Sequence, residues 1–276
     1  MAIITLTTDF GYKDHFVGVI KGAIYKEIPD AKIVDISNEI SPFNIAECAY
    51  ILKNSYKSFP DGTIHIVGVD SEPTPENQHI AVLVDGHYFI TANNGVIGLI
   101  TSEIKPEKVI EINIPNPENG SFPVLDVFVK VACHIARGGK LEVVGKSFNK
   151  LKDIREFAPR IIENGNGIVG SVIYIDNFGN VITNIERHTF EAYRKGRSFV
   201  LNARNKKITQ IHNKYSDIIN FEIEKDKRNG PGDLLALFNS SHFIELAIYK
   251  SDLNTVGGAS TLLGLDYRDT ITIDFT

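Results

Sequence analysis

Apolar and polar positions in the first half of the chain alternate between strand and helix patterns. Apolar and β-branched runs predict three strands, at 3–8, 32–36 and 63–69. A helix is predicted between the first two, because apolar residues recur there at helical spacing until Pro29 ends the pattern: Phe16, Ile20, Ile24 and Ile28. We expect Asp14 to be the N-cap of that helix and 41–44 to open a second one. Such alternation is typical of a largely parallel sheet.

Two further patterns complete the first half. Asp85-Gly86 lies between the apolar runs 80–84 and 87–90, which predicts a tight hairpin that adds an antiparallel pair to the sheet. A helix is predicted over 126–137, with Gly138-Gly139 as its C-terminal cap. The charge-rich segment that follows has only weak periodicity, so we predict an interdomain linker over 151–166.

The second half of the chain changes to short β runs. They lie at 169–175, 181–185, 199–202, 234–238, 243–249 and 270–274. Runs of this kind are typical of a small, mostly antiparallel barrel or sandwich. The sequence therefore predicts two domains: an α/β domain with a largely parallel sheet over 1–150, and a smaller all-β, barrel-like domain over 167–276.

Composition narrows the classes of function. A net charge of -5 argues against a broad electrostatic grip on nucleic acid or on anionic lipid. The two cysteines, Cys48 and Cys133, are too few for a disulfide framework and suit buried thiols in a reducing compartment. No apolar run approaches the roughly 18 residues of a membrane span, and Met1 leads directly into a strand pattern, so we expect a cytoplasmic protein without a membrane partner.

The sequence also lacks the signatures of several kinds of site. The eight histidines show no metal-binding spacing, so no metal is expected. A phosphate loop, a Gly-x-Ser-x-Gly elbow and a dinucleotide fingerprint are all missing from the sequence, which argues against use of nucleoside triphosphates or a serine nucleophile.

Two carboxylates end neighbouring strands of the predicted sheet. Asp9 follows the first strand and Asp70 follows the third, and ligand crevices lie at the carboxyl ends of parallel strands. Asp9 can accept the hydroxyls of a ribose or simply cap the turn after it. Asp70 can orient a water or act as a weak general base, or it can be an ordinary turn residue.

A third candidate is the connection Asp176-Asn177-Phe178-Gly179-Asn180 between two β runs. Its Asn-Phe-Gly-Asn portion suits an ordinary hairpin turn. The same carboxylate, aromatic ring and amide can also hold a cationic amine, stack on a base and hydrogen-bond a purine edge. The residues alone leave both interpretations open.

A combination of short motifs spanning both predicted domains resembles the S-adenosylmethionine hydroxide adenosyltransferases, relatives of the fluorinases and chlorinases. The motifs are Thr7-Thr8-Asp9-Phe10-Gly11, Ser41-Pro42-Phe43, Gly68-Val69-Asp70, Ile175 to Ile185, Gly232-Asp233-Leu234, Asn239-Ser240-Ser241 and Gly264-Leu265. The resemblance implies an α/β domain followed by a barrel-like domain, a homotrimer with the ligand between neighbouring subunits, and displacement of methionine from the 5′ carbon of S-adenosylmethionine. It implies no cofactor beyond this small-molecule adenosyl ligand.

The same resemblance assigns roles to particular residues. Asp9 is expected to take the ribose hydroxyls, and Asp176 the methionine amino group. The adenine is expected to contact Phe178 and Asn180. The remaining expected contacts are Phe43 beside the sugar and, at the methionine carboxylate, Ser240 and Ser241.

At Asp70 the family separates by chemistry, because its hydrolytic members carry aspartate where the halogenating members carry tyrosine. A carboxylate there repels a halide and can hydrogen-bond a water, so the resemblance favours hydrolysis. Two other features of the hydrolytic members are missing. Their arginine after the aspartate is absent from 71–79, and their His-Gly-Arg-Asp run is replaced by Pro123-Val124-Leu125-Asp126.

Three functions are consistent with this sequence. The favoured one is a hydrolase that forms adenosine and L-methionine, with Asp70 as the catalytic group. The second is a non-catalytic protein that binds S-adenosylmethionine or adenosine, because two water-positioning groups are lost. The third is displacement by a different, small nucleophile. Glu72, Glu76 and His79 are hypothetical substitutes for the missing groups, since they lie on the loop after Asp70.

Overall fold

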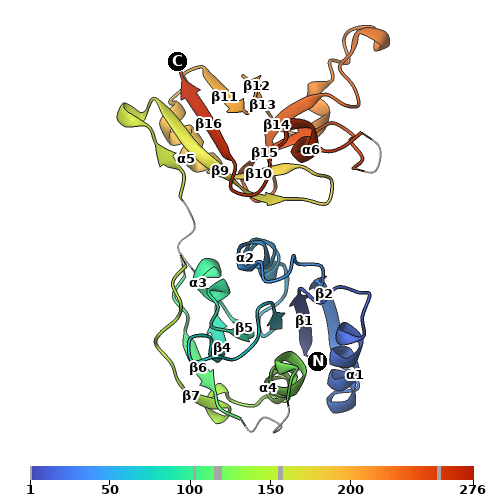
Figure 1. The fold of residues 1–276 in the computed structure, drawn as a ribbon, viewed down its shortest axis with the longest axis vertical. Coiled ribbons are helices and arrows are strands. Elements are labelled where there is room, and N and C mark those ends of the chain that lie inside the picture. Colours follow the sequence, from blue (N-terminus) through green and yellow to red (C-terminus); the bar gives the residue numbers. More distant parts are fainter. Residues whose placement is uncertain (1, 102–103, 115–119, 155–157, 254–255) are drawn as a thin grey trace. The chain divides into compact units, whose positions relative to one another are not determined.

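The chain forms two compact units, which we describe separately. The structure is a computed structural model that describes residues 2–101, 104–114, 120–154, 158–253 and 256–276 (Figure 1). The division falls between Met1–Arg155 and Glu156–Thr276. In the described part of the chain, no helix is both long and apolar enough to cross a membrane.

The first unit is built on a mixed seven-stranded sheet in the order β2-β1-β3-β5-β4-β6-β7. Its strands are β1 (Ile3–Thr8), β2 (Lys32–Ser37), β3 (Ile64–Gly68), β4 (His79–Val84), β5 (His87–Ala92), β6 (Lys108–Ile112) and β7 (Gly145–Ser147). The prediction of a largely parallel sheet is wrong. β2, β1, β3 and β5 pair in parallel, whereas β5, β4, β6 and β7 pair antiparallel. The short Asp85-Gly86 turn reverses the chain, and β6 and β7 continue that antiparallel half.

Helices cover both faces of this sheet. On one face, α1 (Phe16–Glu27) and α4 (Val129–Ala136) bury Ile20, Ile24 and Val131 against β1 and β3. On the other, α2 (Ile45–Lys53) and α3 (Val96–Ile100) pack on β3, β4 and β5. Figure 1 shows the two pairs of helices on opposite sides of the sheet. Short helical turns lie at η1 (Tyr56–Ser58), η2 (Val124–Phe128) and η3 (Leu141–Val143).

Helix ends test the predicted caps. The prediction of Asp14 as an N-cap is wrong: α1 starts after His15, whose side chain makes no capping bond. By contrast, Asn44 caps α2 by accepting a hydrogen bond from the main chain of Glu47. The predicted helix at 126 begins earlier, with the π-helical turn η2. Gly138-Gly139 does close α4, because the two glycine N–H groups donate to Ile135 and His134 at 2.8 and 2.9 Å.

The second unit contains a nine-stranded, mainly antiparallel sheet that is nearly barrel-shaped. Its path is β12-β11-β16-β9-β10-β15-β14-β13, with β8 added beside β9. The strands are β8 (Arg160–Ile161), β9 (Gly167–Ile175), β10 (Val181–Glu186), β11 (Phe199–Ala203), β12 (Lys206–Ile208), β13 (Ile211–His212), β14 (Leu234–Phe238), β15 (Phe243–Ile248) and β16 (Thr270–Phe275). The strands curl around one apolar core, which α5 (Arg187–Arg194) and α6 (Ala259–Leu263) help to fill. Short helical turns lie at η4 (Glu163–Gly165), η5 (Tyr215–Ile218) and η6 (Lys225–Lys227). β8 and η4 fall in the segment predicted as a linker.

A buried histidine pair lies inside the first sheet. His65 is fully buried, shares a hydrogen bond with the Thr5 hydroxyl at 2.7 Å and stacks on Phe89 with ring centroids 4.7 Å apart. Its other ring nitrogen lies 3.1 Å from Nδ1 of His87. Burial, together with the neighbouring His87, lowers the pKa of His65 to about 3. The folded protein therefore keeps this imidazole neutral through most of the acidic range.

This pair predicts acid-sensitive folding. Below pH 6.5 the unfolded chain binds a proton at His65 and the folded chain does not, so stability falls as pH decreases toward the folded pKa of about 3. Linkage gives a loss of about 2 kcal/mol between pH 7.5 and pH 5. We expect urea unfolding at the two pH values to show this difference and His65→Gln to reduce it. The control is His242→Gln, which replaces an exposed histidine and should leave the difference unchanged. A wild-type stability that is flat with pH would contradict the prediction.

Candidate functional site

Asp9 and Asp70 lie next to each other in the first unit, as their places at the strand ends predict. β1 and β3 pair in parallel with Thr8 opposite Gly68, so both carboxylates follow the same edge of the sheet. Both side chains are partly buried. Asp70 is close enough for its charge to raise the pKa of Asp9. The sheet therefore brings two carboxylates together at the end where ligands bind in open parallel sheets.

Burial is the main cause of a raised pKa at Asp9, and the charge of Asp70 adds to it. Hydrogen bonds from the main chain oppose the rise: Phe43 N–H donates to Oδ2 of Asp9 at 3.0 Å, and the main chain of Asp70 also contributes. No ion pair to Asp9 or Asp70 occurs among the residues that the structure describes. Within the described part of the chain, the negative charge here is thus balanced by main-chain N–H groups and by no cationic side chain.

The backbone is strained on both sides of Asp9. Phe43 and Asp70 are not glycines, yet their φ angles are +61° and +45°. Each such conformation costs on the order of 1–3 kcal/mol and is held only where the surroundings enforce it. Phe43 is also 72% exposed, although it is a large apolar side chain. An exposed ring on a strained backbone, next to a half-buried carboxylate, is an arrangement in which a bound ligand can cover the ring.

The floor beside these carboxylates is apolar. A Cβ at Gly68 would lie 3.0 Å from Val124, 3.2 Å from Thr8 and 3.3 Å from Phe10, so a larger residue there would push these side chains apart. Val124 is fully buried in η2, in the Pro123-Val124-Leu125-Asp126 segment. A branched apolar side chain from the segment that replaces the His-Gly-Arg-Asp run therefore lies against Gly68, at the end of β3.

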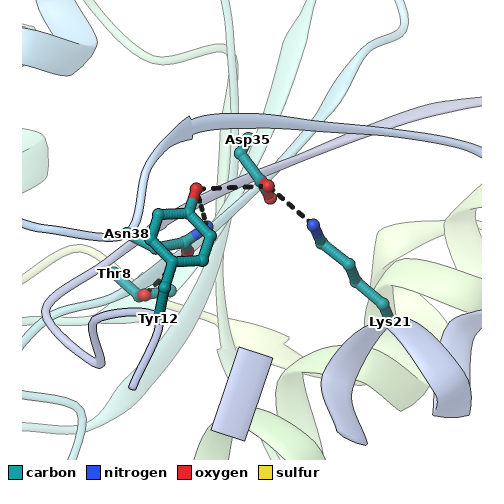
Figure 2. Close-up of polar contacts among 5 residues, drawn as sticks. All are labelled: Thr8, Tyr12, Lys21, Asp35 and Asn38. Carbon is teal, nitrogen blue, oxygen red and sulfur yellow. Dashed lines mark hydrogen bonds and ion pairs between the residues drawn. The ribbon is translucent and has the colours of Figure 1, made fainter. Parts of the chain in front are cut away.

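A chain of polar contacts supports the loop that carries Asp9 (Figure 2). The Thr8 hydroxyl donates to Asn38 at 2.8 Å, and the Asn38 amide donates to the Tyr12 hydroxyl at 3.0 Å. Tyr12 donates to Asp35 at 3.3 Å, and Asp35 pairs with Lys21 at 2.6 Å. The Asn38 carbonyl also accepts from Gly11 N–H. These bonds join the ends of β1 and β2 and fix the start of the 9–15 loop.

The three hypothetical substitutes on the next loop differ in their surroundings. Glu72 and Glu76 are exposed. His79 is buried at the start of β4, donates from Nε2 to the Ser71 carbonyl at 2.9 Å and packs edge-on against Phe128. Burial lowers its pKa. The ring of His79 thus supports the loop rather than presenting a free base.

In the second unit, Asp176 organises the turn between β9 and β10. Its Oδ1 accepts the main-chain N–H of Phe178 at 2.8 Å and of Asn180 at 2.9 Å, and its Oδ2 accepts the Asn180 amide at 2.9 Å. Gly179 has a φ of +74° and lies so close to Gly258 that a Cβ would clash. Phe178 is left 63% exposed, and Asn180 is buried. The turn thus presents an aromatic ring on a rigid frame.

The other predicted contacts of this unit lie in the β14–β15 turn. Asn239 holds that turn by accepting from the main chain of Ser241 at 3.0 Å and of Phe243 at 3.1 Å. Ser240 is exposed and Ser241 is partly exposed. Glu245 is buried on β15, where Tyr215 donates to it at 2.6 Å. Burial raises the pKa of Glu245, and the charge of Asp176 raises it further.

Sequence reasoning missed several supporting residues. Asn38, Asn77 and Asn94 are buried and hydrogen-bond the loops that carry Asp9 and Asp70. The signal for Asn94 was present, because a polar Asn-Asn-Gly stretch follows a buried strand. Among the described residues, no group of three or more His, Cys, Asp or Glu side chains is arranged to hold a metal ion.

Comparison with known proteins identifies similar chains. Residues 4–145 match the SAM hydroxide adenosyltransferase N-terminal domain, and residues 170–272 match its C-terminal domain. The chain is 31% identical to (R)-S-adenosyl-L-methionine hydrolase of Methanocaldococcus jannaschii, over 98% of this chain and 95% of that protein. It is 25% identical to a fluorinase of Nocardia brasiliensis, over 68% and 73% of the two chains.

A solved structure extends the comparison to the fold. The crystal structure of an uncharacterized conserved protein from Thermotoga maritima superimposes with a TM-score of 0.81 at 28% identity, and the match covers 99% of both chains. The arrangement of elements described above therefore recurs in an experimentally determined structure.

Proposed function

This chain belongs to the SAM hydroxide adenosyltransferase family, as the sequence predicted, and we propose that it hydrolyses (R)-S-adenosyl-L-methionine to adenosine and L-methionine. The hydrolase prediction agrees with the relatives, since the M. jannaschii protein and relatives from Salinispora arenicola and Thermus thermophilus bear the name (R)-S-adenosyl-L-methionine hydrolase. In the reaction, a water oxygen bonds to the 5′ carbon, the carbon–sulfur bond breaks toward sulfur, and the water releases a proton.

The observation that carries this proposal is the pair of adjacent carboxylates, Asp9 and Asp70, without a described cationic partner. A ligand with a sulfonium centre brings the missing positive charge, and its ribose brings hydroxyl donors for a carboxylate. Asp9 is fixed by main-chain N–H groups and retains acceptor capacity for the ribose. Asp70 is then the group that orients the attacking water.

The residues of the second unit supply the remaining contacts in this proposal. Asp176 takes the methionine ammonium, and Phe178 and Asn180 take the adenine. The main-chain and hydroxyl groups of Ser240 and Ser241 take the carboxylate. Phe43, from the first unit, packs beside the sugar. The exposure of both phenylalanines supports this assignment, since each ring is free to stack on a ligand.

Water is the favoured nucleophile because of Asp70. Two carboxylates would repel a halide at this position, whereas a water can donate a hydrogen bond to Asp70. The M. jannaschii hydrolase matches 98% of this chain at 31% identity, whereas the fluorinases match 68–69% of it at 24–25% identity. We propose further that the protein acts in the cytoplasm as a homotrimer with its ligand between neighbouring subunits; light scattering on the purified protein tests the trimer.

The direct test is product formation. We expect the purified protein, incubated with R and S sulfonium epimers of S-adenosylmethionine separately, to form adenosine and methionine in equal amounts, and faster from the R epimer. Liquid chromatography with mass detection measures both products.

The outcomes of this assay separate the alternatives. Saturable binding in calorimetry with no adenosine above the uncatalysed background would overturn the hydrolase and favour a binding protein. An adenosyl product of another mass, formed only when a small nucleophile is added, would identify a different displacement. Buffer without protein and heat-denatured protein give the background.

A further inference from the structure

The main chain around Asp70 is held by side chains rather than by the sheet. Four consecutive carbonyls, from Val69 to Glu72, each accept a hydrogen bond from a side chain: Asn94 donates to Val69 at 2.8 Å, Asn77 to Asp70 at 3.1 Å and to Glu72 at 3.0 Å, and His79 to Ser71 at 2.9 Å. We call Asn77, His79 and Asn94 the carbonyl clamp. All three are buried, with 8%, 8% and 3% of their surface exposed.

Two members of the clamp, Asn94 and His79, make further contacts, whereas Oδ1 of Asn77 is buried without a hydrogen-bond partner among the described residues. Asn94 also lies 3.5 Å from the Asp70 carbonyl, and its Oδ1 accepts the N–H of Val96 at 3.1 Å, so both ends of its amide are engaged at the start of α3. His79 is fixed against the ring of Phe128 at 4.8 Å. The clamp therefore grips the segment in which Asp70 has a φ of +45°. A residue in that conformation keeps it only while its surroundings enforce it.

Building on the proposed hydrolase function, we propose that Asn94 and Asn77 are positioning residues, which hold Asp70 in its left-handed conformation and so aim its carboxylate at the attacking water. Such positioning is effective because an error of about 1 Å in the reacting groups costs about 10²-fold in rate. In this proposal, the positioning also lets a site without the family's histidine and arginine turn over. The clamp restricts the orientation of the one remaining water-binding carboxylate.

A matched control lies next to Asn94 in the sequence. Asn93 is also buried, at 5% exposure, and also uses both ends of its amide. It donates to the Lys150 carbonyl at 3.0 Å and accepts the Lys152 N–H at 2.9 Å, and its amide also lies 3.5 Å from Oε1 of Gln78. Replacing Asn93 thus removes a buried asparagine with equivalent bonds while leaving the carbonyls of Val69 and Asp70 untouched.

The experiment compares Asn94→Leu with Asn93→Leu in the full-length protein. We expect Asn94→Leu to lower kcat by about 10–100-fold and to change KM for S-adenosylmethionine by less than about threefold. Asn93→Leu should keep kcat within about threefold of wild type. The midpoint of thermal unfolding should fall by a similar amount in both variants, which separates positioning from folding.

A second pair of variants tests the clamp in case the leucine variants do not fold. Asn94→Asp keeps the acceptor for the Val96 N–H and loses the amide donor, so its kcat should fall at pH 8. The kcat should recover in part at pH 6, where a protonated carboxyl donates a hydrogen bond again. Asn93→Asp should show no recovery at pH 6 beyond that of wild type. If both Asn94 variants kept the kcat of wild type, the proposed role of the clamp would be wrong. It would also be wrong if the Asn93 variants lowered kcat as much as the Asn94 variants do. Either result would leave the proposed hydrolase function standing. A wild-type protein without turnover would overturn the proposed function, and the clamp with it.

Discussion

Replacement of Asp70 by asparagine is expected to lower kcat for adenosine formation by about 10²-fold or more, with KM for S-adenosylmethionine within a few-fold of wild type. Positioned acid–base groups contribute about 10²–10⁴-fold, and this carboxylate is the one such group left beside the proposed nucleophile. Asparagine tolerates a positive φ as well as aspartate does, so the backbone at +45° is preserved. The main-chain bond from residue 70 to Asp9 is preserved too, which keeps ribose binding and hence KM.

The matched control is Glu72→Gln. This change removes a carboxylate from the same loop, but the Glu72 side chain is exposed and only its carbonyl is held by Asn77. Single-turnover kinetics at saturating substrate should show a slow step for Asp70→Asn and a normal rate for Glu72→Gln. A normal rate for Asp70→Asn would remove Asp70 from the chemistry, and a raised KM with normal kcat would reassign it to binding.

The sequence predicted the parts of the fold that depend on local pattern. Apolar spacing located α1, and the helix-opening segment 41–44 located the start of α2, because both signals act within a few residues. The parallel sheet was overestimated for the opposite reason. β6 pairs antiparallel with β4, and the three-residue edge strand β7 pairs antiparallel with β6. The direction of these pairings depends on partners that lie elsewhere in the sequence, so a local pattern does not give it.

The candidate site divides in the same way. Asp9 and Asp70 were found because strand ends in a parallel pair must meet, and the structure does place them side by side. The clamp was not found, because Asn77 and Asn94 donate to main-chain carbonyls. Every residue has such a carbonyl, so the identity of the accepting residue gives no sign of the bond. Asp14 failed as a cap by a single residue, a shift that local sequence rarely fixes.

Charge joins these observations to the chemistry. Asp9 and Asp70 in one unit, and Asp176 with the nearby Glu245 in the other, form two acidic groups. Burial disfavours the ionised form of a carboxylate, and a nearby cation favours it. S-Adenosylmethionine carries two cationic centres, the sulfonium and the ammonium, and in the proposed function these are the charges that the two acidic groups bind. Adenosine carries neither, which favours release of this product.

Replacement of Asp176 by asparagine is expected to raise KM for S-adenosylmethionine by up to about 10²-fold, with a much smaller change in kcat. A hydrogen bond between charged groups is worth about 1.5–3 kcal/mol, and the proposed ammonium contact is lost with the charge. The turn should survive: asparagine Oδ1 can accept from Phe178 and Asn180, and a flipped Asn180 amide can accept from the new NH₂ group. Steady-state kinetics and calorimetric binding measure the effect.

Asp274→Asn is the control for this change. Asp274 is an exposed carboxylate of the same unit that pairs opposite Gly167, at the other end of β9 from Asp176, and it accepts one hydrogen bond from Asn202. Its replacement removes the same charge from the protein, so a general electrostatic effect would appear in both variants. A local contact predicts a raised KM for Asp176→Asn alone. If a substrate analogue without the α-amino group bound wild type and Asp176→Asn with different affinities, the ammonium contact would be wrong, because that analogue has nothing for Asp176 to hold.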